Sequence, residues 1–528
     1  MMGPFRTRVC AAGIGLLMAA SLAPGLAQAP AVTIDAAAPL APMSKYIYGQ
    51  SLEHLGRCID GGIWAEMLDD RKFFHPVAEG ESPWAILGEP RSTAMLTAKA
   101  FVGAHSPEFD VDGASGPAGI SQTGLGIAAG ARYSGRVLLA GGSEAGPIEV
   151  SLVWGSGPSG RQTVTIRTFD ERYRPYPIAF TAGASTEDAR LEIAARGKGR
   201  FRIGTVSLMP ANNVEGFRPD VLALLRELNA PALRWPGGNF VREYNWRDGI
   251  GDRDRRPPRK DPAWKSVAPN DVGVHEFMAL CRLIGAEPYI AVNSGLGDTA
   301  SAAAQVEYVN GAATTPMGAQ RALNGSQTPF NARWWSVGDE THSGWNDRFA
   351  PHVCGEPGTR YVLKDALVTA AGIHAYSRQP DVTSLADNAR TVSVIGAIKT
   401  TKTAAAFDTT GLVLKLYRAH FGQVPVMVTG VPAPLDVAAA WREDRSALTL
   451  AVVNPAAEAQ VMALQLKGAA FAPAATLRRI AGTDPMAHNE PGKPPAVRIE
   501  EIANVPVGDR LTLPAMSISI YELRPLTK

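Results

Sequence analysis

The sequence predicts a domain of alternating helices and parallel strands, with one β-sandwich inserted into it and a second β-sandwich at its C-terminal end. From Val214 to about residue 390, a helical hydrophobic period followed by a short strand recurs several times. Such units place parallel strands side by side, either in a barrel or in an open sheet. The two flanking regions instead carry short runs of strand-forming residues separated by glycine-rich turns.

Composition bounds the class of protein. The chain has 528 residues, which corresponds to about three domains. Hydrophobic residues make up 45% and charged residues 19%, so a large core can be buried and general disorder is excluded. Lys and Arg number 52 against 50 Asp and Glu. No basic excess is available for nucleic acid, and we expect no nucleic-acid partner.

Residues 1–29 are predicted to be a signal peptide. Arg6 and Arg8 form a basic start, Val9–Leu22 is apolar, and Ala27–Ala29 has the small residues of a cleavage site. A buried N-terminal helix is the alternative. We therefore expect export to the periplasm or the medium, without a membrane-spanning segment. Three of the four cysteines remain after cleavage, and an odd number cannot all pair, so we expect no disulfide framework.

Residues 30–81 are expected to supply the first unit of the α/β domain and one strand of the C-terminal sandwich. In this segment Tyr46–Gly49 is predicted to be a strand and Ile63–Phe74 a helix. Residues 82–212 differ in character. Runs such as Ile148–Trp154 and Gln162–Arg167 are separated by turns at a spacing of roughly 8–12 residues, which predicts the inserted β-sandwich.

Residues 213–423 are expected to hold the rest of the α/β domain. One helical face includes Val221 and Leu228, and a second helix ends at Gly285. The strands predicted here are Ala232–Trp235, Tyr289–Val292, Trp334–Gly338 and, after a helix over Tyr361–Tyr376, Val382–Ala386. Strand patterns return in Leu448–Val453 and Met516–Tyr521, so residues 424–528 are predicted to form the C-terminal β-sandwich.

Polar side chains follow the predicted parallel strands at the ends where active sites of such folds lie. Glu53 follows the first strand, Asn239 the second, Asn293 the third, and Asp339 and Glu340 the fourth. No zinc-ligand spacing, phosphate loop or nucleophile elbow occurs at these turns, so no metal or cofactor is expected. Carboxylates transfer protons, amides bind hydroxyl groups and nearby tryptophans stack on sugar rings, which together favour a carbohydrate substrate.

Several motifs carry a specific family resemblance. They are Ile47–Arg57, Gly61–Trp64, Leu233–Phe240, Tyr244–Gly249, Arg256–Pro257, Ala263–Lys265 and Gly285–Ile290. Together they resemble the α-L-arabinofuranosidases of glycoside hydrolase family fifty-one. The resemblance implies a (β/α)8 barrel, a sandwich built mainly from the C-terminal segment, and an insertion similar to carbohydrate-binding β-sandwiches. It also implies retaining hydrolysis of terminal arabinofuranosides by two Glu residues without a metal.

The resemblance assigns a role to each matching residue. Glu340 matches the general acid/base, which protonates the leaving oxygen and then deprotonates water. Glu53 and Asn239 match ligands of the sugar hydroxyl groups, and Trp264 matches an aromatic residue of the sugar pocket. Asp339 stands where the family usually has a sugar-binding Asn. Taken singly, Glu53 is also compatible with an ion pair, Trp264 with core packing and Asn239 with a turn.

The sequence departs from the family at the nucleophile. The family has Glu-Trp-Asn, whereas here Gly344 precedes Trp345 and Asn346, only four residues after Glu340. About three βα units, on the order of a hundred residues, separate the two carboxylates in an intact member. We therefore expect an incomplete barrel, truncated after Glu340, with strands one to four and eight.

Two functions follow from this departure. The first is an exo-acting α-L-arabinofuranosidase, impaired by the internal deletion, that releases terminal L-arabinofuranose from arabinose-containing plant polysaccharides. The alternative is a non-catalytic protein that binds arabinan or arabinoxylan. In a third reading Asp339, Asp347 or Glu356 serves as the second carboxylate. Each reading has an arabinofuranosyl-containing oligo- or polysaccharide as the partner, and none indicates an oligomeric state.

Overall fold

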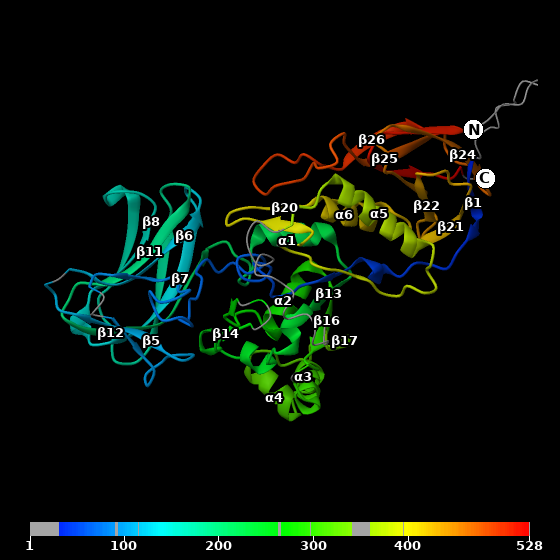
Figure 1. Ribbon diagram of the computed structural model, residues 1–528. Coiled ribbons are helices and arrows are strands. Elements are labelled where there is room, and N and C mark those ends of the chain that lie inside the picture. The colour runs from blue at the N-terminus through cyan, green and yellow to red at the C-terminus, as the bar shows by residue number, and fades with distance from the viewer. Residues whose placement is uncertain are drawn as a thin grey trace, which may run out of the picture.

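The computed structural model describes residues 31–89, 93–114, 116–261, 264, 266–295, 297–339, 359–393 and 395–526. The predicted signal peptide, Glu340, Gly344, Asp347 and Glu356 lie outside the described residues. In Figure 1 the inserted β-rich unit lies on one side, the parallel strands and their helices lie in the middle, and the C-terminal sheet lies beyond helices α5 and α6.

A five-stranded sheet forms the centre of the molecule. Its order is β17-β16-β13-β2-β18, and every neighbouring pair is parallel. The strands are β2 (Gly49–Ser51), β13 (Ala232–Trp235), β16 (Glu287–Val292), β17 (Trp334–Val337) and β18 (Asp387–Asn388). The expected set of five parallel strands is thus confirmed for the described residues. These strands form an open sheet with β17 and β18 at its edges, and no closed barrel is present in the described part of the chain.

Helices cover one face of this sheet and bury its apolar side chains. They are α1 (Pro219–Leu228), α2 (Val274–Ile284), α3 (Thr299–Asn310), α4 (Pro316–Leu323), α5 (Leu363–Ser377) and α6 (Thr409–His420). Leu225 and Leu228 of α1 and Phe277 of α2 belong to the same core as Leu233 and Trp235 of β13. Alternate residues of β13 point to opposite faces, so Arg234 lies on the side away from this core.

Three local predictions were wrong. Lys45–Tyr48 is a short 3-10 helix, and the first strand begins only at Gly49. Residues 63–74 form turns and extended chain instead of a helix, because Asp70 and Phe73 have positive φ and Met67 N–H donates to Leu208 O of the insertion. The last parallel strand is Asp387–Asn388, immediately after the predicted range, because pairing with β2 sets its position.

The insertion consists of two five-stranded antiparallel sheets, in the orders β10-β7-β12-β5-β4 and β3-β6-β11-β8-β9. Its strands are β3 (Ala85–Leu87), β4 (Thr93–Leu96), β5 (Ser106–Val111), β6 (Ala118–Ile127), β7 (Arg132–Gly141), β8 (Ile148–Val153), β9 (Arg161–Ile166), β10 (Arg174–Thr181), β11 (Thr186–Ala195) and β12 (Gly199–Pro210). Val137 and Leu139 of one sheet and Val150 and Leu152 of the other fill one shared core, as in a β-sandwich.

The C-terminal region forms a nine-stranded sheet, in the order β26-β25-β28-β23-β22-β21-β1-β24-β27. The strands are β1 (Val32–Pro39), β21 (Val424–Thr429), β22 (Asp436–Trp441), β23 (Leu448–Asn454), β24 (Gln460–Lys467), β25 (Ala474–Ala481), β26 (Glu500–Pro506), β27 (Arg510–Leu513) and β28 (Ser517–Leu523). Leu450 shares a core with Leu464 and Leu513, so the sheet folds over itself, whereas Ala451 and Val453 face the central core on the side of α5.

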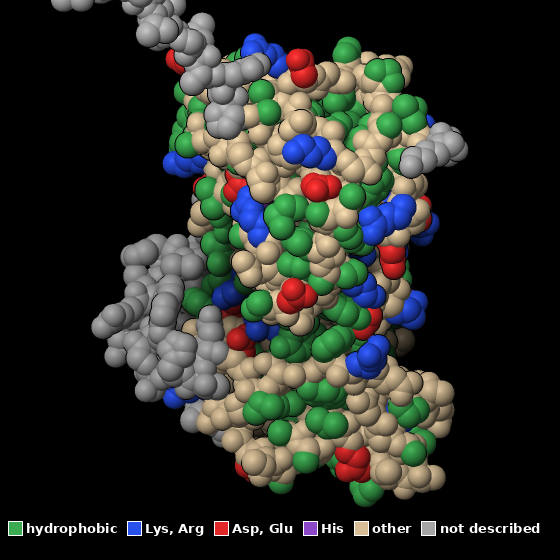
Figure 2. Space-filling model, turned by 90° about the vertical axis from the view of Figure 1, so that its right-hand side faces the viewer, with side chains coloured by type: hydrophobic (Ala, Val, Ile, Leu, Met, Phe, Trp, Pro, Cys, Tyr) green, Lys and Arg blue, Asp and Glu red, His purple; other side chains and the backbone are tan. Residues whose placement is uncertain are grey.

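The surface and the cysteines fit the sequence composition. On the face shown in Figure 2, basic and acidic side chains are interspersed, in keeping with a formal net charge of +2. Cys58 and Cys281 are free and buried. In the part of the chain that the structure describes, no helix is long and apolar enough to cross a membrane.

Candidate active site

Three of the predicted site residues meet at the carboxyl end of the parallel sheet. Glu53 lies two residues beyond β2, Asn239 lies in the 3-10 helix Gly238–Arg242 after β13, and Asp339 follows β17. Gly238 lies between the two carboxylates: its N–H donates to Asp339 Oδ2 over 2.5 Å, and a Cβ added to it would lie 1.8 Å from Glu53 Oε1. Only glycine allows this approach, because Gly238 also has a φ of +65°.

Glu53 is fully buried, and its partners include Trp264 and Arg390. Its Oε1 accepts a hydrogen bond from Trp264 Nε1 at 3.0 Å, and its Oε2 forms an ion pair with Arg390, which follows β18. Trp264 is 7% exposed, so its ring is packed and its indole N–H is directed at the carboxylate. The structure therefore brings Glu53, Trp264 and the polypeptide after β18 together.

Asp339 is held by Arg234, the residue of β13 that points away from the helical core. Both terminal guanidinium nitrogens lie 3.2 Å from the Asp339 carboxylate. Arg234 Nε also lies 3.7 Å from Asp387 Oδ2. Burial is the main cause that raises the pKa of Asp387 to about 6, while Arg234 lowers this pKa and Asp339 raises it. The charge at position 339 is thus balanced by a cation.

Asn239 is buried, with 9% of its surface exposed. The residue after it, Phe240, packs against His54. The rings of Phe240 and His54 stack with their centroids 3.7 Å apart. Burial lowers the pKa of His54 to about 3, so its imidazole is neutral. Its Nδ1 atom has no hydrogen-bond partner among the described residues.

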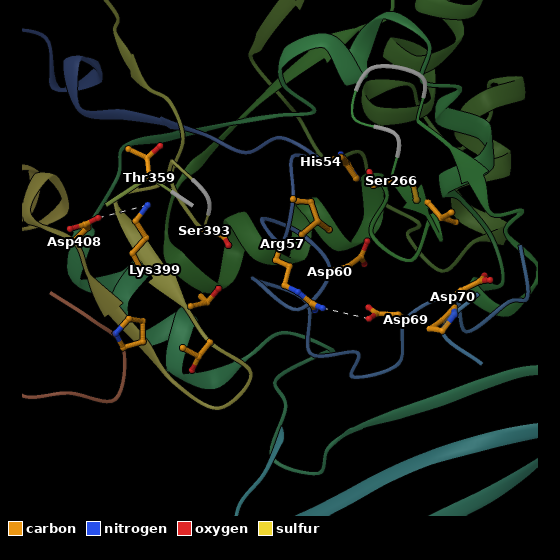
Figure 3. A pocket seen from close by; sticks show the side chains of 18 of the residues that line it. His54, Arg57, Asp60, Asp69, Asp70, Ser266, Thr359, Ser393, Lys399 and Asp408 are labelled. Atoms are coloured by element: carbon orange, nitrogen blue, oxygen red, sulfur yellow. Dashed lines mark hydrogen bonds and ion pairs between the residues drawn. The ribbon is translucent and has the colours of Figure 1, made fainter. Parts of the chain in front are cut away.

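A cavity of about 750 Å³ adjoins this cluster. His54, Arg57 and Asp60 line one wall, and the other walls come from the segment before the insertion, the hairpin β19 (Ile398–Thr400)–β20 (Ala405–Phe407) and the loop at Asn489. Figure 3 shows the ion pair between Arg57 and Asp69 in this cavity and the pair between Lys399 and Asp408 toward its other end.

Sequence reasoning missed Arg234, Asp387, Arg390 and His54. Arg234 and His54 lie inside the motifs on which the family resemblance rests, so the signal was present, but no role was drawn from it. Asp387 and Arg390 were hidden because the last strand was predicted to end at Ala386. Glu340 lies outside the described residues. Among the residues that are described, no three His, Cys, Asp or Glu side chains come together as metal ligands would.

Comparisons with known sequences point to one family. The α-L-arabinofuranosidase 1 domain matches residues 224–369, and the α-L-arabinofuranosidase C-terminal domain matches residues 335–517. Over 136 residues the chain is 42% identical to α-L-arabinofuranosidase C of Emericella nidulans, a match that covers 26% of this chain and 27% of that protein. An intracellular exo-α-(1→5)-L-arabinofuranosidase of Bifidobacterium longum is also 42% identical over 136 residues, which cover 26% of this chain and 24% of the relative. The chain thus matches about a quarter of the length of these curated relatives.

Solved structures show the same fold over almost the whole chain. An arabinose-bound α-L-arabinofuranosidase, MgGH51, has a TM-score of 0.79 at 18% identity and covers 94% of this chain and 100% of its own. An α-L-arabinofuranosidase from Thermotoga maritima in an arabinose complex has a TM-score of 0.60 at 21% identity, with the same coverage. Both matched domains are domains of α-L-arabinofuranosidases, and together they span residues 224–517. The chain thus carries the two domains of the α-L-arabinofuranosidase family, and it shares the fold of these solved structures.

Proposed function

We propose that the protein binds terminal L-arabinofuranosyl units of arabinose-containing plant polysaccharides, as a retaining, exo-acting α-L-arabinofuranosidase whose turnover is impaired. One observation supports this most directly: Glu53, Asn239, Trp264 and Asp339 lie together at the carboxyl end of the parallel sheet. A carboxylate, an amide and an indole in one place suit a small sugar rich in hydroxyl groups. The residues that supply them are those that match the family motifs.

In this proposal Glu340 is the general acid/base. It follows Asp339 directly in the sequence, and a neighbouring carboxylate would raise the pKa of Glu340. The pairing of Asp339 with Arg234 reduces that effect, because the cation offsets the negative charge at position 339. Glu340 would protonate the leaving-group oxygen in the first step and deprotonate water in the second.

The proposed reaction lacks the carboxylate that acts as nucleophile in the family. Retention of configuration needs two carboxyl groups about 5–5.5 Å apart, and Gly344, at the position of the family nucleophile, has no side chain to attack the anomeric carbon. Loss of a nucleophile removes several kcal/mol of transition-state stabilisation, since about 1.4 kcal/mol corresponds to a tenfold change in rate. We therefore expect little release of arabinose by the unmodified protein.

Hydrolysis of 4-nitrophenyl α-L-arabinofuranoside, with and without azide or formate, tests the proposal. We expect a negligible rate without the anion and partial recovery with it, because a small anion can occupy the position of the missing carboxylate. Hydrolysis at ordinary glycosidase rates without an added anion would contradict the impairment. Single replacement of Asp339, Asp347, Glu356 and Asp387 by the matching amide would then identify the carboxylate that acts as nucleophile.

A non-catalytic binding protein is the second candidate. It is favoured by the insertion, which forms two sheets around a hydrophobic core of its own. The family resemblance of the sequence implies a carbohydrate-binding sandwich at this position. Retention on insoluble arabinan or arabinoxylan, with no sugar released and no recovery by azide, would favour this function over the impaired enzyme.

We also propose that the chain is exported after removal of residues 1–29, on the strength of the basic start, the apolar stretch and the Ala27–Ala29 site. The intact mass of the protein recovered outside the cytoplasm should correspond to a start at Pro30. Recovery of the full-length chain from the cytoplasm alone would contradict this.

A further inference from the structure

The cavity beside the buried cluster is placed to hold more than a terminal sugar. At about 750 Å³ it is within the range of small-molecule binding pockets. Its lining includes His54, the residue after the buried Glu53, and extends to Asp70 before the insertion and to Asn489 in the C-terminal region. Segments far apart in the sequence therefore meet around one cavity beside the proposed sugar site. Figure 3 shows this for His54, Ser266 and Lys399.

His54 supplies an observation that points to a ligand. The residue is 8% exposed, its ring stacks on Phe240, and its Nδ1 has no hydrogen-bond partner among the described residues. Burial keeps the imidazole neutral, with one N–H donor and one acceptor nitrogen. A buried polar atom without a partner is unfavourable, and a hydroxyl group in the cavity can either donate to Nδ1 or accept from it.

The charge of the cavity indicates what kind of ligand it takes. In the described part of its lining, six carboxylates face three Lys and Arg side chains. The cations are paired: Arg57 with Asp69 at 3.5 Å, Lys399 with Asp408 at 3.7 Å, and Arg360 with Glu490 at 4.0 Å. The remaining carboxylates are Asp60, Asp70 and Glu81.

This surplus of negative charge disfavours an anionic ligand. Glu81 also contacts His75 at 3.7 Å and Lys260 at 3.2 Å, so its charge is partly compensated. Asp70 is engaged by the backbone N–H groups of Phe74 and His75. Asp60 is the carboxylate of this group nearest to His54 in sequence. In a partly enclosed site, its negative charge would repel the carboxylate of an anionic ligand.

We propose that this cavity binds the part of the polysaccharide that carries the terminal arabinofuranose, that it accepts neutral chains and rejects chains bearing uronic acids, and that His54 hydrogen-bonds to a hydroxyl group of that chain. The proposal rests on the proposed function, because it assumes that the terminal sugar occupies the cluster around Glu53. It goes beyond that function by naming the chemical class of the polymer and the residues that select it.

Calorimetric titration of the full-length protein at pH 8 tests the proposal. Burial raises the pKa of Asp60 to about 7, so this carboxyl group is ionised under these conditions. Three ligands are compared: methyl α-L-arabinofuranoside, an arabinofuranosyl xylotriose, and the same oligosaccharide with a glucuronosyl substituent. We expect the neutral oligosaccharide to bind about tenfold more tightly than the methyl glycoside. The uronate form should bind about fivefold more weakly than the neutral one, with a smaller difference at high salt.

Two variants assign the effect to residues. H54F keeps an aromatic ring against Phe240 but removes both ring nitrogens, and it should lower affinity for the neutral oligosaccharide about fivefold relative to the methyl glycoside. D60N should reduce the difference in affinity between the neutral and the uronate oligosaccharide. The control E458Q, at an exposed position in the C-terminal sheet region, should leave this difference in affinity unchanged. If H54F fails to fold, D60N still decides the question of charge selection.

The outcomes separate this inference from the proposed function. If the methyl glycoside binds and the neutral oligosaccharide binds no more tightly, the cavity does not hold the polymer. The inference is then wrong, while the proposed function stands. If the uronate and neutral ligands bind equally, the charge selection is wrong. If no arabinofuranosyl ligand binds at all, both the inference and the proposed function fail.

Discussion

Gly238 shows how one residue determines the geometry of the candidate site. Its N–H contacts Asp339 and its Cα lies against the Glu53 carboxylate, so a side chain at this position would push apart two of the proposed sugar ligands. The Gly-Gly-Asn sequence of the motif is therefore required for packing as well as for the turn. In contrast, Gly372 in α5 has no heavy atom within 4 Å of an added Cβ.

These two glycines form a matched pair for mutation. Gly238→Ala should lower the free energy of unfolding by about 2 kcal/mol, because its φ is positive and its Cβ would overlap Glu53. Gly372→Ala should raise it by about 0.5–1 kcal/mol, because alanine is the better helix former. Urea unfolding measures both values, and equal effects of the two changes would contradict the tight packing inferred at Gly238.

Asp387 should give the protein a recognisable pH dependence. Its folded pKa of about 6 lies above the ordinary 3.8, chiefly because of burial. Well below pH 4 the carboxyl group is protonated in both the folded and the unfolded protein, so its burial then costs little free energy. As the pH rises from about 4 to 6, the group ionises in the unfolded protein but stays protonated in the folded one, and the free energy of unfolding falls. Asp387→Asn should reduce the fall in the free energy of unfolding between pH 4 and pH 7 by about 1 kcal/mol, allowing for solvent screening. Unfolding free energies at pH 4 and pH 7 test this, and an unchanged difference between the two would contradict it.

At the scale of elements, the segment before the insertion joins the sandwich to the central domain through buried charges. Arg71 donates to Asp271 through two nitrogens at 2.6 Å and to Asp254 at 2.8 Å. Arg136 of β7 reaches the same Asp254 at 2.6 Å. Arg71 and Asp271 are almost completely buried. This network lies in the segment that the sequence predicted to be a helix and in which the structure has turns around Arg71.

Removal of Arg71 should therefore be costly. Arg71→Met leaves Asp271 and Asp254 without one of their partners and should destabilise the protein by about 3–5 kcal/mol, as for other broken buried ion pairs. Arg200→Met in the inserted sandwich breaks an exposed pair with Asp110 and should cost less than about 1 kcal/mol. Denaturant unfolding measures both variants, and a cost for Arg71→Met no larger than that for Arg200→Met would refute a structural role of this network.

At the scale of the whole molecule, the hydrophobic core is divided unevenly. The insertion has its own core. The C-terminal sheet has a core around Leu450, but its other face joins the core of the central domain, where Ala451 and Ile520 cluster with Leu363 of α5. The protein should therefore unfold in at least two steps, with the insertion separate from the rest. Scanning calorimetry should give a calorimetric enthalpy above the van't Hoff enthalpy, and Arg71→Met should move the steps further apart. A single two-state transition would show that the units unfold together.

The sequence by itself determined the local units with a strong period or a specific motif. Helices α1 and α2, the strands that follow them and the strand-rich regions 82–212 and 424–528 were predicted because apolar spacing and turn residues act over a few neighbouring positions. The motifs likewise placed Glu53, Asn239 and Asp339 after parallel strands, and parallel strands bring such ends to one edge of a sheet.

The tertiary structure alone decided where short strands lie and which charges are paired. β18 has only two residues, and its position follows from pairing with β2, more than three hundred residues earlier in the chain. For the same reason Arg390 could not be matched to Glu53, nor Arg71 to Asp271, until the chain was folded. Periodicity carries information between near neighbours, whereas an ion pair depends on distance in space, and only the packing of the sheet and its flanking units brings these distant residues together.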